Sequence, residues 1–145
     1  MKISSRGRYA LRFMIDLAQH RQVDAVTLRE VSQRQEISTK YLEQIVTLLN
    51  RSGLIRSVRG NQGGYLLARD PKAYTAGDIL RAVEGELLPV ACLENNPNLC
   101  RRHDACNTLR FWEGLYHVVN QYVDGITLQE MADQCDAKTE WSYSI

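Results

Sequence analysis

Residues 37–70 read ISTKYLEQIVTLLNRSGLIRSVRGNQGGYLLARD, and the spacing of their apolar residues changes once along the way. Helical spacing over residues 39–52, between an expected N-cap at Ser38 and an expected C′ residue at Gly53, predicts a helix. Residues 54–58 and 65–69 then predict two short strands, joined by the glycine-containing turn RGNQGG. A helix that leads directly into a hairpin is typical of the second half of a winged helix–turn–helix.

The residues before this stretch predict the other helices of such a motif. Residues 8–20 place apolar side chains on one face at helical spacing, which predicts an amphipathic helix. The pattern T-x-x-E from Thr27 to Glu30 is a capping box, and it predicts a short helix to about Arg34, followed by a turn over 35–37. The expected fold class is therefore mostly α with a small β-hairpin wing.

The residues after the hairpin predict two further helices separated by an irregular segment. The sequence TAGD, which begins at Thr75, is typical of a helix start, and this helix should run to Gly85. Residues 86–103 have no clean period, and a long helix is expected from Asp104 to about Asp124. This helix is apolar enough to pair across a dimer. Its apolar positions are Leu109, Trp112, Leu115, Val119, Tyr122 and Ile126.

Charge is distributed unevenly along the 145 residues. Residues 1–69 carry 12 Lys and Arg against 5 Asp and Glu, a net +7, and residues 70–145 carry 6 against 12, a net −6, which together give the formal +1. A basic half of this kind favours a polyanionic partner, double-stranded DNA above all. No apolar run approaches the roughly 18 residues of a membrane span, and no secretory signal is recognisable, so we expect a cytoplasmic protein without membrane contact.

A winged helix–turn–helix presents the first residues of its second helix to the major groove. Short hydroxyls and a lysine suit phosphates, whereas Gln44 can pair with adenine and Glu43 can accept from a cytosine amino group. In the wing, Arg59 can enter a narrow minor groove, and Arg56 can reach a phosphate. The candidate DNA-contacting residues are Ser38, Thr39, Lys40, Tyr41, Glu43, Gln44, Arg56 and Arg59.

Three of the four cysteines lie in the segment CLENNPNLCRRHDAC, residues 92–106. The spacing C-x7-C-x5-C in an irregular loop predicts a metal site, because clustered cysteines in a reducing compartment bind metal more often than they form disulfides. Thiolates select zinc, copper(I) or an iron–sulfur cluster, and a fourth ligand is left open. The candidates for the fourth ligand are His103, Asp104, Glu94, Asn107 or a residue of a partner subunit, whereas Cys135 is expected to be a free thiol.

Four segments resemble the family of IscR-type iron–sulfur cluster regulators, which also includes the nitric-oxide-sensing repressor NsrR and the cysteine-metabolism repressor CymR. They are MKISSRGRYALRFMIDLA, TKYLEQIVTLLNRSGLIRSVRGNQGGYLLARDP, TAGDILRAVEG and the three-cysteine loop. The resemblance implies a homodimeric transcription factor on a pseudo-palindromic operator. It also implies a [2Fe–2S] cluster on Cys92, Cys100 and Cys106 and control of iron–sulfur cluster assembly genes. Its recognition contacts carry over to Ser38, Tyr41, Glu43, Gln44 and Arg59.

The chain departs from this pattern at two positions and in its first cysteine spacing, which has seven intervening residues where IscR has five. IscR places its fourth ligand, a histidine, where this chain has Leu109, and NsrR-like proteins place an acidic residue where it has Arg8. One alternative is a cluster-free regulator of the same fold, which responds to thiol oxidation or to a cysteine-biosynthesis enzyme. A second is a small iron–sulfur electron-transfer or carrier protein. No nucleophile–base pair is recognisable, so we expect no enzyme.

The expected organisation is a winged helix–turn–helix DNA-binding domain over residues 1–85 and a cysteine-containing sensor loop over 86–106. A dimerisation helix and a C-terminal helix would follow over 107–135, and a mobile tail over 136–145.

Overall fold

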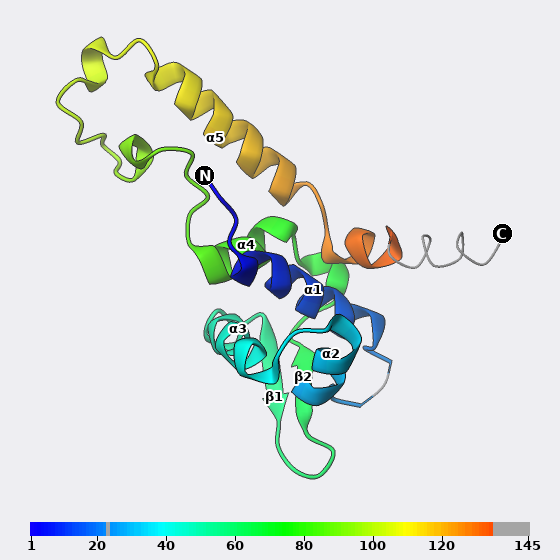
Figure 1. The fold of residues 1–145 in the computed structure, drawn as a ribbon. Helices are drawn as coiled ribbons and strands as arrows, with labels where there is room; N and C mark the ends of the chain where they lie inside the picture. Colours follow the sequence, from blue (N-terminus) through cyan, green and yellow to red (C-terminus); the bar gives the residue numbers. More distant parts are fainter. Residues whose placement is uncertain (23, 135–145) are drawn as a thin grey trace.

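The computed structural model describes residues 1–22 and 24–134. It is mostly helical with one two-stranded antiparallel sheet, as the sequence predicts (Figure 1). No helix among the described residues is long and apolar enough to cross a membrane. The elements, in chain order, are α1 (Ser5–Gln19), α2 (Leu28–Gln35), α3 (Thr39–Arg51), β1 (Ile55–Val58), β2 (Gly64–Leu67), the 3-10 turn Pro71–Ala73, α4 (Ala76–Glu84), the 3-10 turns Ala91–Leu93 and His103–Ala105, and α5 (Leu109–Asp124).

The helix–turn–helix is formed by α2 and α3, and local capping sets its ends. Thr27 and Glu30 form the expected capping box at the start of α2, and Glu36 ends the helix in the left-handed conformation with φ 56°. The Ser38 side chain caps α3 by accepting a hydrogen bond from the Tyr41 backbone, and Gly53 follows the helix with φ 72°. Both helices therefore begin and end where the sequence predicts, within one residue or two.

The wing is the hairpin of β1 and β2, in which Ile55 pairs with Leu67 and Val58 pairs with Gly64. A backbone bridge from Val26 to Tyr65 attaches the segment before α2 to the second strand. Gly64 has φ 154°, and a Cβ atom there would overlap the Val26 backbone carbonyl. Glycine at position 64 therefore allows this close approach between the wing and the segment before α2.

One core joins α1, α3, α4 and the base of the wing. Its fully buried side chains include Phe13, Leu42, Ile45, Leu49 and Ile79. Burying residues of this size stabilises the fold by roughly 1.5–3 kcal/mol each. These helices therefore form a single packed body that carries the recognition helix and the wing.

An arm leaves this body after α4 (Figure 1). It consists of the irregular segment 86–108 and the helix α5, which has no buried residue. The predicted helix start at Asp104 is wrong, because His103–Ala105 form a 3-10 turn and Cys106 is extended, with ψ 112°. The helix begins at Leu109 instead.

After the arm the chain returns to the body. Residues 128–134 are helical, with the expected capping box between Thr127 and Glu130. Leu128 is fully buried, and its backbone N–H donates to the Tyr74 carbonyl at 3.0 Å. The predictions for Cys135 and for a mobile tail over 136–145 lie outside the described residues.

Candidate functional site

The first two turns of α3 present a row of polar side chains to solvent. Ser38, Thr39, Lys40, Glu43 and Gln44 are exposed, whereas Tyr41 is half-buried. The Ser38 hydroxyl oxygen accepts the capping hydrogen bond from Tyr41 at 3.2 Å, so its own hydrogen is left to donate to a phosphate. This arrangement is what major-groove readout by the N-terminal part of a recognition helix requires.

Tyr41 is held in place from α1. Its ring meets the ring of Tyr9 edge to face, with centroids 5.5 Å apart. The Arg8 and Arg12 guanidinium groups lie 5.8 and 5.4 Å from the centroid of the Tyr9 ring, at cation–π distance. Arg12 also donates to the Gln35 side chain at 3.2 Å and to its backbone carbonyl. The α1 helix therefore supports both the turn of the motif and the first turn of α3.

A buried carboxylate fixes α2 against α1. Asp16 is 1% exposed and accepts two hydrogen bonds from Arg34, at 3.0 and 2.7 Å, and one from Gln35 at 3.0 Å. The Asp16 carboxylate raises the pKa of Arg34 through these hydrogen bonds. A buried charge with three hydrogen-bond donors is satisfied, so this contact fixes the packing of the two helices.

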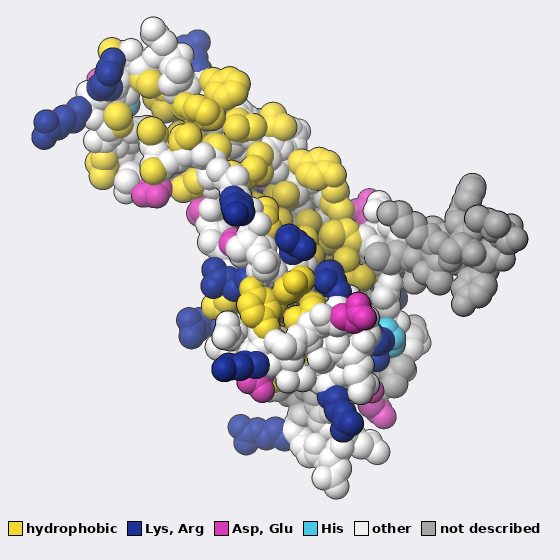
Figure 2. Space-filling model, viewed as in Figure 1, with side chains coloured by type: hydrophobic (Ala, Val, Ile, Leu, Met, Phe, Trp, Pro, Cys, Tyr) yellow, Lys and Arg dark blue, Asp and Glu magenta, His cyan; other side chains and the backbone are white. Residues whose placement is uncertain are grey.

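The wing carries its two candidate arginines on solvent-exposed positions. Arg56 lies on β1 and Arg59 in the turn, and both are exposed. Gly60 has φ 109° and allows the tight turn after Arg59. In the space-filling view, Lys and Arg side chains are scattered over the visible face of the body, whereas the widest hydrophobic surface follows the arm (Figure 2). The face that carries α3 and the wing is suited to a polyanion.

The three cysteines all lie on the arm. Cys92 and Cys100 are exposed, and Cys106 is half-buried. Asn98 links the first two, because its amide donates to the Cys92 carbonyl and its side-chain oxygen accepts from the Cys100 N–H, both at 2.9 Å. The Cys106 thiol lies 3.4 Å from the Thr108 hydroxyl, and this hydrogen bond lowers the pKa of the thiol, with a smaller contribution from Arg102. A lowered pKa favours the thiolate, which is the form that binds metal.

The cysteines do not converge in this conformation. Among residues 1–22 and 24–134, no group of three or more His, Cys, Asp or Glu side chains is placed to hold a metal ion. The donor set nevertheless fits an iron–sulfur cluster chemically, because three accessible thiols share one loop and one of them has a lowered pKa. The loop would have to rearrange to bring these thiols together.

Of the four candidate fourth ligands in this chain, His103 and Asp104 contact each other within the loop. His103 places Nδ1 2.7 Å from the Cys100 carbonyl and Nε2 3.0 Å from the Asp104 carboxylate. Glu94 and Asn107 are exposed, which leaves their side-chain oxygens accessible. None of the four is gathered with the cysteines into a site in this conformation.

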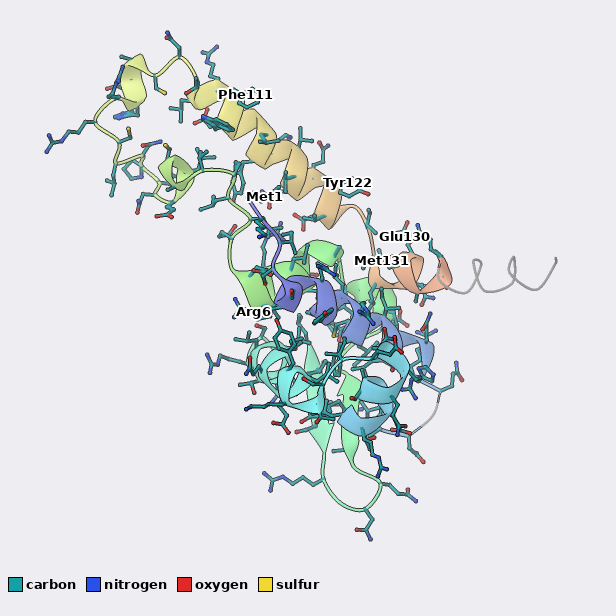
Figure 3. All side chains as sticks on the ribbon, viewed as in Figure 1. Met1, Arg6, Phe111, Tyr122, Glu130 and Met131 are labelled. Carbon is teal, nitrogen blue, oxygen red and sulfur yellow. The ribbon has the colours of Figure 1, made fainter. Side chains whose placement is uncertain are left out.

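An apolar groove of about 360 Å³ runs between α5 and the body. Phe111, Val118 and Tyr122 on α5 are 63%, 59% and 68% exposed. Figure 3 shows Phe111 near the first residues of α5 and Tyr122 near its last, with Met1 beside the helix. So large an apolar face on one helix is typical of an interaction surface. The groove is lined by Met1, Ile3, Leu80, Leu87, Val118, Val119, Tyr122 and Val123.

Several contacts that position these surfaces could not be found by sequence reasoning. The Glu84 carboxylate accepts from the backbone N–H groups of Ser4 and Gly7, at 3.0 and 2.9 Å, and so caps α1 from α4. Arg81 binds Asp124 and Asn120 on α5. Both contacts join residues about 40 or more positions apart, so no local pattern signals them.

Comparison with known proteins agrees with this architecture. The model of the Rrf2 family, described as an iron-dependent transcriptional regulator, matches residues 3–134. The chain is 38% identical to the HTH-type transcriptional regulator CymR of Bacillus subtilis over 140 residues, which cover 97% of this chain and 96% of that protein. It is also 38% identical to the HTH-type transcriptional regulator IscR of Yersinia enterocolitica over 136 residues, which cover 94% and 82%.

Two solved structures show the same arrangement. The structure of CymR (YrzC), the global cysteine regulator of B. subtilis, superposes with a TM-score of 0.77 at 36% identity, covering 92% of this chain and 98% of that one. The structure of T. potens IscR superposes with a TM-score of 0.74, also at 36% identity, covering 93% and 88%. With the winged helix–turn–helix and with similarity over nearly all of its length, the chain belongs to the Rrf2 family of DNA-binding transcriptional regulators.

Proposed function

We propose that this regulator is a homodimer that senses iron–sulfur cluster status through residues 86–106 and controls iron–sulfur cluster assembly genes from a pseudo-palindromic operator. The observation that carries the proposal is the placement of Cys92, Cys100 and Cys106 on one accessible loop that leads directly into α5. The IscR relatives support the same reading, whereas the CymR relative keeps a cluster-free alternative open.

In this proposal the apolar face of α5 is the dimer contact. Exposed Phe111, Val118 and Tyr122 lie on a helix with no buried residue, and a second copy would remove them from water. A two-fold axis through such a contact repeats the recognition helix and the wing on the other subunit. Two half-sites related by symmetry on the operator would follow.

Cys92, Cys100 and Cys106 would hold the [2Fe–2S] cluster, with the fourth position taken by one of His103, Asp104, Glu94 and Asn107 or by the partner subunit. A bound cluster supplies a group whose presence follows iron supply and oxidation. The chain's own contribution is the loop, which must bring its thiols together for ligation and is joined directly to α5. Ligation would favour the loop conformation that holds the cluster better, and α5 would then fix the spacing of the two recognition helices or the orientation of Glu43.

The experiment that tests this proposal compares the wild type with the triple variant Cys92→Ala, Cys100→Ala, Cys106→Ala. Both are purified without oxygen, with and without reconstitution by iron and sulfide, and titrated with operator selected from random duplexes. The proposal predicts that reconstitution changes affinity or sequence choice only in the wild type. Identical binding by all four preparations would contradict it, and a monomer at the concentrations used would contradict the dimer.

A second candidate function is supported by one observation, the accessible Cys106 thiol with its lowered pKa. In this version the regulator holds no cluster and reads thiol oxidation, or it binds a cysteine-biosynthesis enzyme as its protein partner. Operator affinity would then respond to peroxide in preparations free of iron and would be restored by a thiol reductant. Replacing Cys106 by serine would abolish this response.

A further inference from the structure

A cavity of about 330 Å³ lies at the base of the wing, away from the first turns of α3. It is bounded by the end of α1, the outer face of the hairpin and the segment that follows β2. Arg21, Arg56 and Arg69 line it together with His20 and Asp70, and we call it the root cavity. Apolar side chains such as Leu17 and Tyr65 complete its wall.

The charge of the root cavity is unbalanced. Three guanidinium groups face one carboxylate, and that carboxylate, on Asp70, lies 3.6 Å from Arg21. Arg56 and Arg69 have no ion pair within residues 1–22 and 24–134 of this structure. Like charges gathered around one concave space repel one another, and an anion bound between them relieves that repulsion.

The fold positions the guanidinium of Arg69 and the backbone of Arg56. The Arg69 guanidinium lies over the ring of Tyr74, 4.6 Å from its centroid, and the backbone N–H of Arg69 donates to the Tyr74 hydroxyl at 2.9 Å. Tyr74 is fully buried and donates its own hydroxyl to the Leu54 carbonyl at 2.6 Å, so the platform is rigid. Strand pairing with Leu66 holds only the backbone of Arg56, whose side chain is exposed. A planar guanidinium that is already oriented loses little entropy when it binds an oxyanion.

We propose that the root cavity is an anion-binding site that takes a phosphate-type oxyanion through Arg21, Arg56 and Arg69. The oxyanion can come from two sources. One is a backbone phosphate of DNA that flanks the minor groove occupied by the wing, and the other is a free phosphorylated or carboxylated small molecule. The chemistry of recognition is the same for both, because each presents several oxygens to a fork of N–H donors.

The free-anion source is tested on the full-length protein with inorganic phosphate and pyrophosphate at constant ionic strength. The side-chain Nε–Hε resonances of the arginines are followed by NMR. The resonances of Arg21, Arg56 and Arg69 should shift and saturate, and those of Arg110 on the distant arm should not. Arg69→Gln should abolish the saturable shifts of the Arg21 and Arg56 resonances. Arg69→Lys should retain part of these shifts, and Arg110→Gln should leave them unchanged.

The DNA source is tested by the salt dependence of operator binding, with duplexes that end at the wing contact or extend beyond it. The plot of log K against log salt has a negative slope, and losing one phosphate contact makes this slope shallower by about 0.9. If the site holds a DNA phosphate, Arg69→Gln makes the slope shallower by this amount on the longer duplex only. A merely structural role for Arg69 would weaken binding without changing the slope.

The two measurements together decide the proposal. Saturating shifts with an unchanged slope assign the site to a free anion, and a reduced slope assigns it to DNA. Two results together would overturn the proposal. The salt slope is unchanged in Arg69→Gln, and the arginine resonances of the wild type show no saturable shift with either phosphate or pyrophosphate. Thermal unfolding of each variant ensures that only folded protein is compared.

Discussion

Arg81 on α4 and Asp124 at the end of α5 form a two-pronged ion pair, with Nη1 to Oδ1 at 2.8 Å and Nη2 to Oδ2 at 2.9 Å. Asn120 accepts a further hydrogen bond from Arg81. The ion pair joins the arm that bears the cysteines to the body that carries α3 and the wing. The arm is also tied to the body just after α5, where Thr75 pairs with Thr127 and the Ala76 N–H donates to the Ile126 carbonyl at 2.9 Å.

The ion pair makes stability depend on pH in acid. Hydrogen bonds from Arg81 lower the pKa of Asp124 below its usual 3.8, so the folded state favours the carboxylate. The stabilisation is therefore complete above about pH 4 and is lost as the pH falls through the folded-state pKa. Because Asp124 is 45% exposed, we expect less than about 1 kcal/mol. Unfolding free energies of the wild type and Asp124→Asn should differ at neutral pH and converge in acid.

Gly77 leaves the space that this ion pair occupies. A Cβ atom at position 77 would overlap the Asp124 carboxylate and lie 2.7 Å from Arg81 Nη1. Gly77→Ala should therefore push the two side chains apart and break the ion pair, so the loss of less than about 1 kcal/mol offsets most of the usual gain of about 1 kcal/mol for alanine over glycine in a helix. The double variant with Asp124→Ala provides the control, because it removes the overlap. Gly77→Ala should stabilise the Asp124→Ala background more than the wild type in denaturant unfolding, and an equal change in both backgrounds would show that Asp124 does not limit this position.

Arg59 is predicted to read the minor groove. Replacing it by alanine should weaken operator binding by about 1–3 kcal/mol, because a guanidinium is lost from a site of strong negative potential. Fluorescence anisotropy with labelled operator measures the loss, and Arg110→Ala on the arm is the matched control. Equal operator affinity for Arg59→Ala and the wild type would contradict the predicted contact between Arg59 and the minor groove.

The buried Asp16 should matter for folding. Asp16→Ala leaves the Arg34 guanidinium and the Gln35 amide without their hydrogen-bond acceptor. We expect a cost of about 2 kcal/mol, less than for a fully buried pair because Arg34 is 34% exposed. Urea unfolding gives the value, and Thr27→Ala, which removes only a capping hydroxyl, should cost about 1 kcal/mol. A smaller effect for Asp16→Ala than for Thr27→Ala would show that the charge is not structural.

The parts of the fold that sequence could predict are those that neighbouring residues determine. Capping boxes such as the one from Thr27 to Glu30 and the positive φ of Gly53 depend on a few consecutive residues, so their signals were readable. Apolar spacing places the start of α5 at Asp104 and not at Leu109, because it does not reveal that Cys106 adopts an extended backbone. Spacing marks a helical face well and a helix end poorly.

The candidate sites also differ in whether neighbouring residues in the sequence determine them. The exposed row on α3 follows from its place in a recognised motif, and the structure leaves those side chains in solvent. The root cavity could not be predicted, because Arg21, Arg56 and Arg69 come from three separate segments that only the tertiary fold brings together. Cysteine spacing predicts which thiols share a loop, but it says nothing of whether they converge without a bound group.

The central claim, that Cys92, Cys100 and Cys106 hold an iron–sulfur cluster, is tested most directly by visible absorption with iron and sulfide analysis of protein purified without oxygen. The account predicts visible charge-transfer bands with equal iron and sulfide, two of each per chain for a [2Fe–2S] cluster, all lost in the triple Cys→Ala variant. A colourless protein that contains stoichiometric zinc, or no metal at all after reconstitution, would contradict it.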